Sequence, residues 1–144
     1  MSGTLLNLDK LAAEQAQKMV TAAQDGIEGV KNPLETLERL ATKTLGVLQA
    51  QGVYAMMLFL FSRSSDEEKV ATICIRPQLF QALKELPGFQ NAGVPPDQAD
   101  AKTALQFYSK KVLDNLDTLL LVRDLYEQTL IYARYHAKAL GGNE

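Results

Sequence analysis

The chain has 144 residues, of which 47% are hydrophobic and 22% are charged, with 15 Lys and Arg against 17 Asp and Glu. This is enough apolar material for the core of one ordinary domain, and it excludes a chain that is disordered throughout. The formal charge of −2 argues against binding to nucleic acid or membranes by bulk basicity, so any contact with a polyanion needs a local basic patch.

Residues that could support catalysis or metal binding are few. Cysteine and histidine occur once each, as Cys74 and His136; this excludes an internal disulfide, suits a reducing compartment and is too few ligands for a zinc site. We interpret Asp114 and Asp117 as an exposed helix face, and we find no phosphate-binding glycine loop or nucleophile elbow. The sequence therefore predicts a protein that is not an enzyme and that uses no metal or cofactor.

Targeting and membrane signals are weak. The N-terminus has no basic segment followed by a long apolar one, so we expect no signal peptide. The longest unbroken apolar run, 52–61, has ten residues, whereas a membrane-spanning helix needs about 20. We therefore expect a helix buried in a cytoplasmic protein and no contact with a membrane.

Apolar residues recur at helical spacing almost throughout the chain, which predicts an all-α fold. A first helix should begin near Leu8, capped by Asn7 or Asp9, and end at Gly26 and Gly29.

The clearest helix start is Asn32-Pro33-Leu34-Glu35, with a cap, a proline in the first turn and an acid. This helix should run toward Phe61, with Gly46 and Gly52 as weak points, because glycine costs about 1 kcal/mol relative to alanine in a helix interior. Residues 53–61 are apolar on every face, so they must lie centrally or bury one side against another chain.

The acidic turn that follows predicts a helix over 66–76, which should end at Pro77 because the residue before a proline avoids helical angles. A β-strand over 72–75 is the alternative that we consider less favoured. A short helix over 78–86 should come next.

The sequence 87–96 contains three prolines and two glycines and predicts a loop. From Asp97 we expect the last and longest helical region, reaching to about Leu140. Within this region the apolar side of the helix changes at residues 119–122, and this segment, apolar all round, should be deeply buried. The whole chain, 1–144, should form a single compact bundle of about five to six helices with a long C-terminal helix and disordered tails at 1–6 and 141–144.

Basic residues align on one side of this last region. Arg123, Arg134 and Lys138 project together with Glu127, because residues eleven apart on a helix differ by about 20°. The pattern has two readings: a solvated face with an Arg123–Glu127 ion pair, or a basic strip that touches phosphates. Candidates that extend a phosphate-binding patch, if the fold brings them alongside, are Lys110, Lys111, Arg63 and Lys43.

Two segments resemble a known family. Residues 51–63, QGVYAMMLFLFSR, are similar to the glycine-led apolar helix of the small helical subunit of type III CRISPR–Cas effector complexes, the Cmr-type small subunit. Residues 123–140 resemble the closing helix of that family. A tryptophan is common there, whereas this chain has no tryptophan and places Tyr135 near that position; only Arg134 and Lys138 represent the basic cluster.

The resemblance implies a non-catalytic subunit of a crRNA-guided ribonucleoprotein in antiviral defence. Its partners would be other subunits of the effector complex, copies of itself, and crRNA or target RNA, with no small-molecule substrate. Base pairing with the guide would read the target sequence, while the subunit contacts the backbone. The alternative, based on the apolar segment 52–61, is a helical adaptor or self-associating scaffold that binds no nucleic acid.

Overall fold

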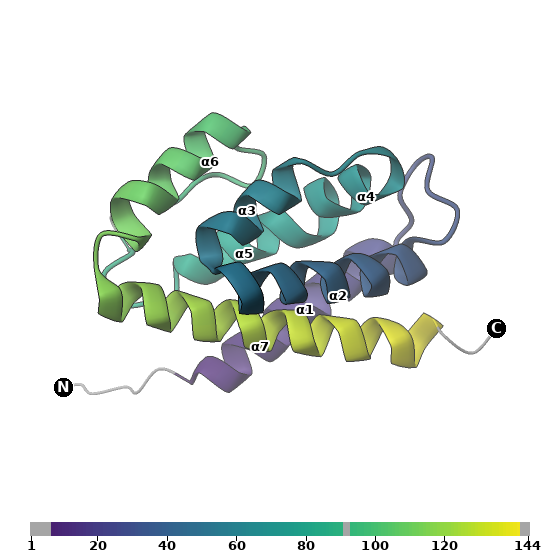
Figure 1. Cartoon of the computed structure of the whole chain (residues 1–144). Helices are drawn as coiled ribbons and strands as arrows, with labels where there is room; N and C mark the ends of the chain where they lie inside the picture. Colours follow the sequence, from purple (N-terminus) through teal and green to yellow (C-terminus); the bar gives the residue numbers. More distant parts are fainter. Residues whose placement is uncertain (1–6, 91–92, 142–144) are drawn as a thin grey trace.

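The computed structural model describes residues 7–90 and 93–141, which form six continuous helices and no strand (Figure 1). The helices are α1 (Leu8–Gln24), α2 (Pro33–Gln51), α3 (Val53–Phe61), α4 (Ser65–Val70) with the π-helical turn η1 (Ala71–Ile75) and α5 (Arg76–Leu83), α6 (Ala101–Phe107) with the π-helical turn η2 (Tyr108–Val112), and α7 (Leu116–Gly141). The predicted all-α bundle with a long C-terminal helix is confirmed. The expected tails 1–6 and 142–144 lie outside the described residues, and Gly141 is the last residue of α7.

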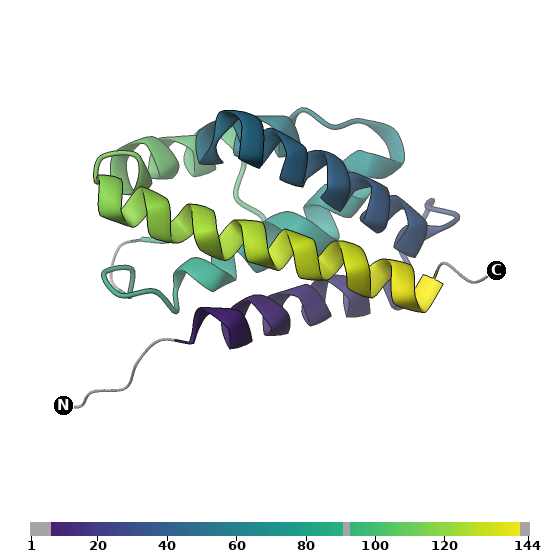
Figure 2. The ribbon, with the colours of Figure 1, turned by 60° about the horizontal axis from the view of Figure 1, so that its bottom comes forward.

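The helix α7 lies between α1 and α2 and packs along both (Figure 2). Its buried residues are Val122, Leu125, Tyr126, Thr129, Leu130, Ala133 and Ala137. Tyr132 and His136, which helical spacing places on the same apolar side, are only partly buried. The helix α2 runs antiparallel to α7, because Gln49 near the end of α2 contacts Arg123 while Leu34 near its start lies against Gly141. One long edge of α7 therefore borders α2.

The predicted weak point at Gly52 is where α2 ends and α3 begins. Gly52 has φ +100°, a conformation that residues with a Cβ rarely adopt, and its N–H donates to Leu48 O at 2.9 Å. Gly46 lies inside α2 without a break. After Gly52 the chain turns, so that Met56 and Met57 of α3 enter the core.

The expected end of a helix at Pro77 is wrong. The chain is helical from Ser65 to Leu83, because the turn before the proline is widened into the π-helix η1. There the N–H of Arg76 donates to Ala71 O, five residues back. A proline ring clashes with the carbonyl four residues earlier in a regular helix, and we attribute its tolerance here to this wider turn. The segment 72–75 is accordingly helical rather than a strand.

The last helical region begins later than expected and is not continuous. Asp97 accepts hydrogen bonds from the Gln81 amide at 3.0 and 3.1 Å, and α6 begins instead after Asp100, whose side chain accepts from Thr103 N–H at 2.8 Å. A break at residues 113–115 then separates η2 from α7. The described residues of the expected loop 87–96 lie outside the helices.

The expected enclosure of residues 119–122 is also wrong. Only Val122 is buried, whereas Leu120 is 48% exposed and Leu116 at the start of α7 is 67% exposed. The break before α7 lets this helix project beyond the ends of α1 and α2, so its first two turns have fewer neighbours. Leu116 and Leu120, one turn apart on α7, are left exposed on one side of the helix, and Leu113 in the break is exposed as well.

Two fully buried tyrosines connect the second half of the chain to the core. Tyr126 of α7 donates its hydroxyl to Leu79 O at 3.1 Å, and its oxygen lies 2.5 Å from the hydroxyl of Tyr108 in η2. Because Tyr126 has one proton, Tyr108 is the donor in the second bond. Burial raises the pKa of both phenols, so each remains a neutral hydrogen-bonding group.

The apolar segment can be tested as core against interface. Met57 is fully buried, whereas its neighbour Leu58 is exposed. We expect Met57→Glu to lower the free energy of unfolding by about 4 kcal/mol or more, because an unpaired charge enters the core. Leu58→Glu should change it by less than about 1 kcal/mol. Urea denaturation followed by circular dichroism measures both, and equal effects of the two variants would contradict this packing.

Candidate nucleic-acid interface

The edge of α7 that borders α2 holds the basic residues singled out in the sequence. Arg123, Arg134 and Lys138 lie along this edge, since they share one side of a continuous helix. From Arg123 to Lys138 the helix rises about 22 Å at ~1.5 Å per residue. The edge therefore has the length needed to contact several phosphates of one strand.

Arg123 does not form the ion pair with Glu127 that belongs to the solvated-face reading. Its Nη2 donates to Gln49 O at 3.4 Å, while the Gln49 amide donates to Glu127 Oε2 at 2.8 Å. Gln49 lies in the last turn of α2, where carbonyl groups have no partner within the helix and the helix dipole is negative. The negative end of the α2 dipole thus attracts the guanidinium of Arg123. Gln49 lies between the charges of Arg123 and Glu127.

Arg134 and Lys138 form no ion pair within residues 7–90 and 93–141. The guanidinium of Arg134 lies over the ring of Tyr135, with 4.8 Å from its central carbon to the ring centroid, and Tyr135 is 59% exposed. An exposed ring beside a guanidinium is a combination on which nucleic-acid bases stack. Lys138 lines a groove between α1, α2 and α7 together with Lys31, Glu35 and Glu38.

A second group of cations lies along the other edge of α2. Lys43 Nζ is 2.7 Å and Arg39 Nε is 3.8 Å from Glu67 Oε2, and Arg63 Nη1 is 3.4 Å from Glu67 Oε1. In the described part of the chain, all the ion pairs converge on this one carboxylate. The fold thus brings Lys43 and Arg63 together, across α2 from Arg123. We call Arg39, Lys43, Arg63 and Glu67 the Glu67 cluster.

Arg63 is the most firmly held cation of the Glu67 cluster. Its Nε donates to Phe59 O at 3.0 Å, and its guanidinium lies over the Phe59 ring at 3.8 Å from the centroid. Partial burial raises the pKa of Glu67, but the hydrogen bonds and charges of Lys43 and then of Arg63 outweigh it, so the pKa lies below its ordinary value of 4.5. Glu67 is therefore ionised at neutral pH.

Sequence reasoning missed Arg39 and Glu67. Arg39 lies one turn before Lys43 on α2, and this spacing of four residues is a signal that could have identified it. Glu67 is 28 residues from Arg39 in the sequence, and only the turn between α3 and α4 brings them together. No local pattern identifies that contact.

Lys110 and Lys111 lie near the end of α7 that is opposite to Lys138. Both are exposed on η2, just before the start of α7, whereas Lys138 is near its end. Along α7 alone, Leu116 and Lys138 are separated by about 33 Å at ~1.5 Å per residue. The structure thus assembles Lys43 with Arg63, and Arg123 with Arg134 and Lys138, and it places Lys110 and Lys111 near the opposite end of α7 from Lys138.

Few other features suggest a chemical site. Cys74 is buried, and desolvation raises the pKa of its thiol to about 12. Within residues 7–90 and 93–141, no three His, Cys, Asp or Glu side chains are grouped so that they could hold a metal ion. Over the same ranges, every helix is too short or too polar to cross a membrane. Comparisons with protein-family models, curated proteins and solved structures find no match to this chain.

The Glu67 cluster predicts a specific pH dependence of stability. A carboxylate whose pKa is lowered by folding stabilises the native state above its unfolded pKa, and this contribution is lost as pH falls through the folded pKa. We expect Glu67→Gln to reduce the free energy of unfolding by about 0.5–1 kcal/mol at pH 7. The difference from wild type should shrink as pH falls below about 4.5.

Urea titrations at a series of pH values measure this difference. Glu68→Gln is the matched control, because Glu68 accepts a hydrogen bond from the Thr72 hydroxyl at 3.0 Å and forms no ion pair among the described residues. A Glu67→Gln effect that is constant over the acid range would show that the cluster does not form.

Proposed function

We propose that this chain is a non-catalytic small subunit of a crRNA-guided ribonucleoprotein effector complex of type III CRISPR defence. In this function it contacts the backbone of the guide–target duplex or target RNA through the edge of α7 that borders α2. The observation that supports the proposal most directly is the alignment of Arg123, Arg134 and Lys138 along that edge, with Arg134 and Lys138 unpaired among the described residues.

The distribution of charge supports a local contact rather than a general one. The chain has a net charge of −2, yet the two edges of α2 bring together six cations and four carboxylates. The cations are Arg39, Lys43, Arg63, Arg123, Arg134 and Lys138, and the carboxylates are Glu35, Glu38, Glu67 and Glu127. A modest local excess of this kind suits weak phosphate contacts. Neighbouring subunits in an assembly would strengthen them by raising the effective concentration.

The proposed mechanism needs no base recognition by this chain. Cations on α7 position the phosphate backbone, and pairing with the guide RNA reads the sequence. Tyr135 adds an exposed ring on which an unpaired base can stack beside Arg134. In a complex these contacts would act together with those of other subunits and other copies of this chain.

The test is a triple charge reversal, Arg123→Glu, Arg134→Glu and Lys138→Glu. We expect this variant to lose binding of target RNA in the assembled complex, because like charges would then face the phosphates. For single-stranded RNA, the slope of log affinity against log salt should become shallower by about 2, at ~0.7 per lost phosphate contact. Fluorescence anisotropy with labelled RNA measures both quantities.

A matched control is the triple reversal Lys10→Glu, Lys18→Glu and Lys84→Glu, which changes the net charge equally at exposed positions on α1 and after α5. This control should bind RNA nearly as wild type does. Equal losses in the two triple variants, or no loss in either, would contradict the proposed interface.

One observation favours the alternative, a self-associating scaffold. Its original basis, the segment 52–61, is largely core, because Val53, Met56, Met57 and Leu60 are buried. Exposed Leu116 and Leu120, one turn apart on α7, instead offer an apolar surface on which copies could associate.

The scaffold function predicts that Leu116→Gln with Leu120→Gln converts an oligomer into a monomer while the helical spectrum is retained. Leu58→Gln, at another exposed leucine, is the control and should leave the oligomer intact. Light scattering after size exclusion measures the mass. A wild-type chain that is monomeric at every concentration tested would contradict the scaffold function.

A further inference from the structure

The Glu67 cluster contains more hydrogen-bond donors than its carboxylate can use. Of its three contacts, only that from Lys43, at 2.7 Å, is short; Arg63 is at 3.4 Å and Arg39 at 3.8 Å. Arg39 makes no side-chain hydrogen bond to another described residue, and a guanidinium has five N–H donors. One carboxylate therefore balances three cations incompletely, in charge and in hydrogen bonds.

The unused donors are open to solvent, and the carboxylate is covered. The side chains of Arg39 and Lys43 are 49% and 47% exposed, while that of Glu67 is 15% exposed beneath them. Arg63 is fixed from the other side by the ring and the carbonyl of Phe59. An anion arriving from solvent would thus meet Arg39 and Lys43 first, with Glu67 behind them.

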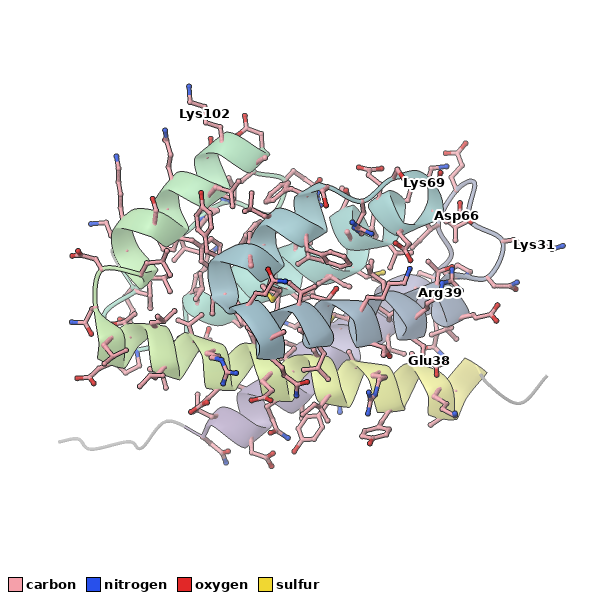
Figure 3. All side chains as sticks on the ribbon, viewed as in Figure 1. Lys31, Glu38, Arg39, Asp66, Lys69 and Lys102 are labelled. Atoms are coloured by element: carbon pink, nitrogen blue, oxygen red, sulfur yellow. The ribbon has the colours of Figure 1, made fainter. Side chains whose placement is uncertain are left out.

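Other carboxylates near the Glu67 cluster are held elsewhere or face another way. Glu68 accepts a hydrogen bond from the hydroxyl of Thr72, and Glu38 lines the groove with Lys138 beyond the opposite edge of α2. Asp66 lies at the same end of the molecule as Arg39, but so do Lys31 and Lys69 (Figure 3). Neither these carboxylates nor Glu35, one turn before Arg39, form an ion pair with Arg39, Lys43 or Arg63, so among the described residues only Glu67 pairs with them.

We propose that Arg39, Lys43 and Arg63 form a second phosphate site, in which Glu67 competes with the phosphodiester for the cations. Arginine binds phosphate through its planar fork and lysine as a point charge, so this set of donors suits a phosphate oxyanion. Glu67 keeps the cations arranged when no phosphate is bound. It also lowers their affinity for phosphate, because the phosphate must replace the contacts between Glu67 and the cations.

This inference rests on the proposed function for the identity of the ligand as RNA. The Glu67 cluster lies across α2 from Arg123, and a helix with its side chains is about 10–12 Å wide. Along the axis of α2, Lys43 lies a further ~9 Å from Gln49, the contact of Arg123, at ~1.5 Å per residue. One strand that crosses the exposed face of α2 would then contact both groups of cations.

The test compares Glu67→Gln with Glu68→Gln, which change the charge equally at adjacent positions. The probes are a short single-stranded oligouridylate and inorganic tripolyphosphate, measured by anisotropy and by calorimetry on the full chain. We expect Glu67→Gln to bind both probes about threefold to tenfold more tightly than wild type, and Glu68→Gln to bind them as wild type does. Unchanged or weaker binding by Glu67→Gln, or equal gains in both variants, would overturn the second site.

A second variant avoids dependence on the stability of Glu67→Gln. Arg39→Gln with Lys43→Gln alters only half-exposed side chains, and it should weaken binding of tripolyphosphate and flatten its salt dependence. Unchanged tripolyphosphate binding in this double variant would also overturn the second site.

If RNA binding survives the α7 triple reversal while tripolyphosphate still responds to Glu67→Gln, the proposed function fails and the second site stands. If instead the α7 triple reversal abolishes RNA binding while tripolyphosphate binding does not respond to Glu67→Gln, the proposed function stands and the second site fails.

Discussion

The burial of α7 between α1 and α2 is the contact on which the rest of this molecule depends. Seven residues of α7 are buried, and Tyr126 among them donates to Leu79 O, which fixes the rotation of the helix about its axis. Once that rotation is set, Arg123, Arg134 and Lys138 must emerge beside α2. The position of the basic edge is thus a consequence of core packing, and its chemistry is separate from the forces that hold the bundle together.

Charge on the exposed face of α2 is organised by one carboxylate. Glu67 pairs with cations from α2 and from the turn after α3, and it thereby joins α2 to α4. An arrangement of this kind holds cations at fixed positions without neutralising them, because three positive groups share one negative group. It explains how a chain with a net charge of −2 can keep a locally basic surface.

The sequence predicted the helices well where their signals are local, as with the cap at Asn7, the break at Gly52 and the inward face of α7. It failed where tertiary geometry decides. Pro77 is accommodated by a wider turn, and the leucines at the start of α7 are exposed because that helix projects past its neighbours. The alignment of Arg123 with Lys138 followed from helical periodicity, whereas the convergence of Arg39, Lys43 and Arg63 on Glu67 depends on contacts between distant segments.

The most direct test of the account is to map RNA onto the surface by NMR, following backbone and arginine side-chain resonances of the labelled chain during titration with single-stranded RNA. The account requires that the resonances of Arg123, Arg134 and Lys138 shift together and that those of the exposed face of α2 follow. Shifts confined to Lys110 and Lys111, or to the outer surface of α1, would contradict it, as would a spectrum that RNA leaves unchanged.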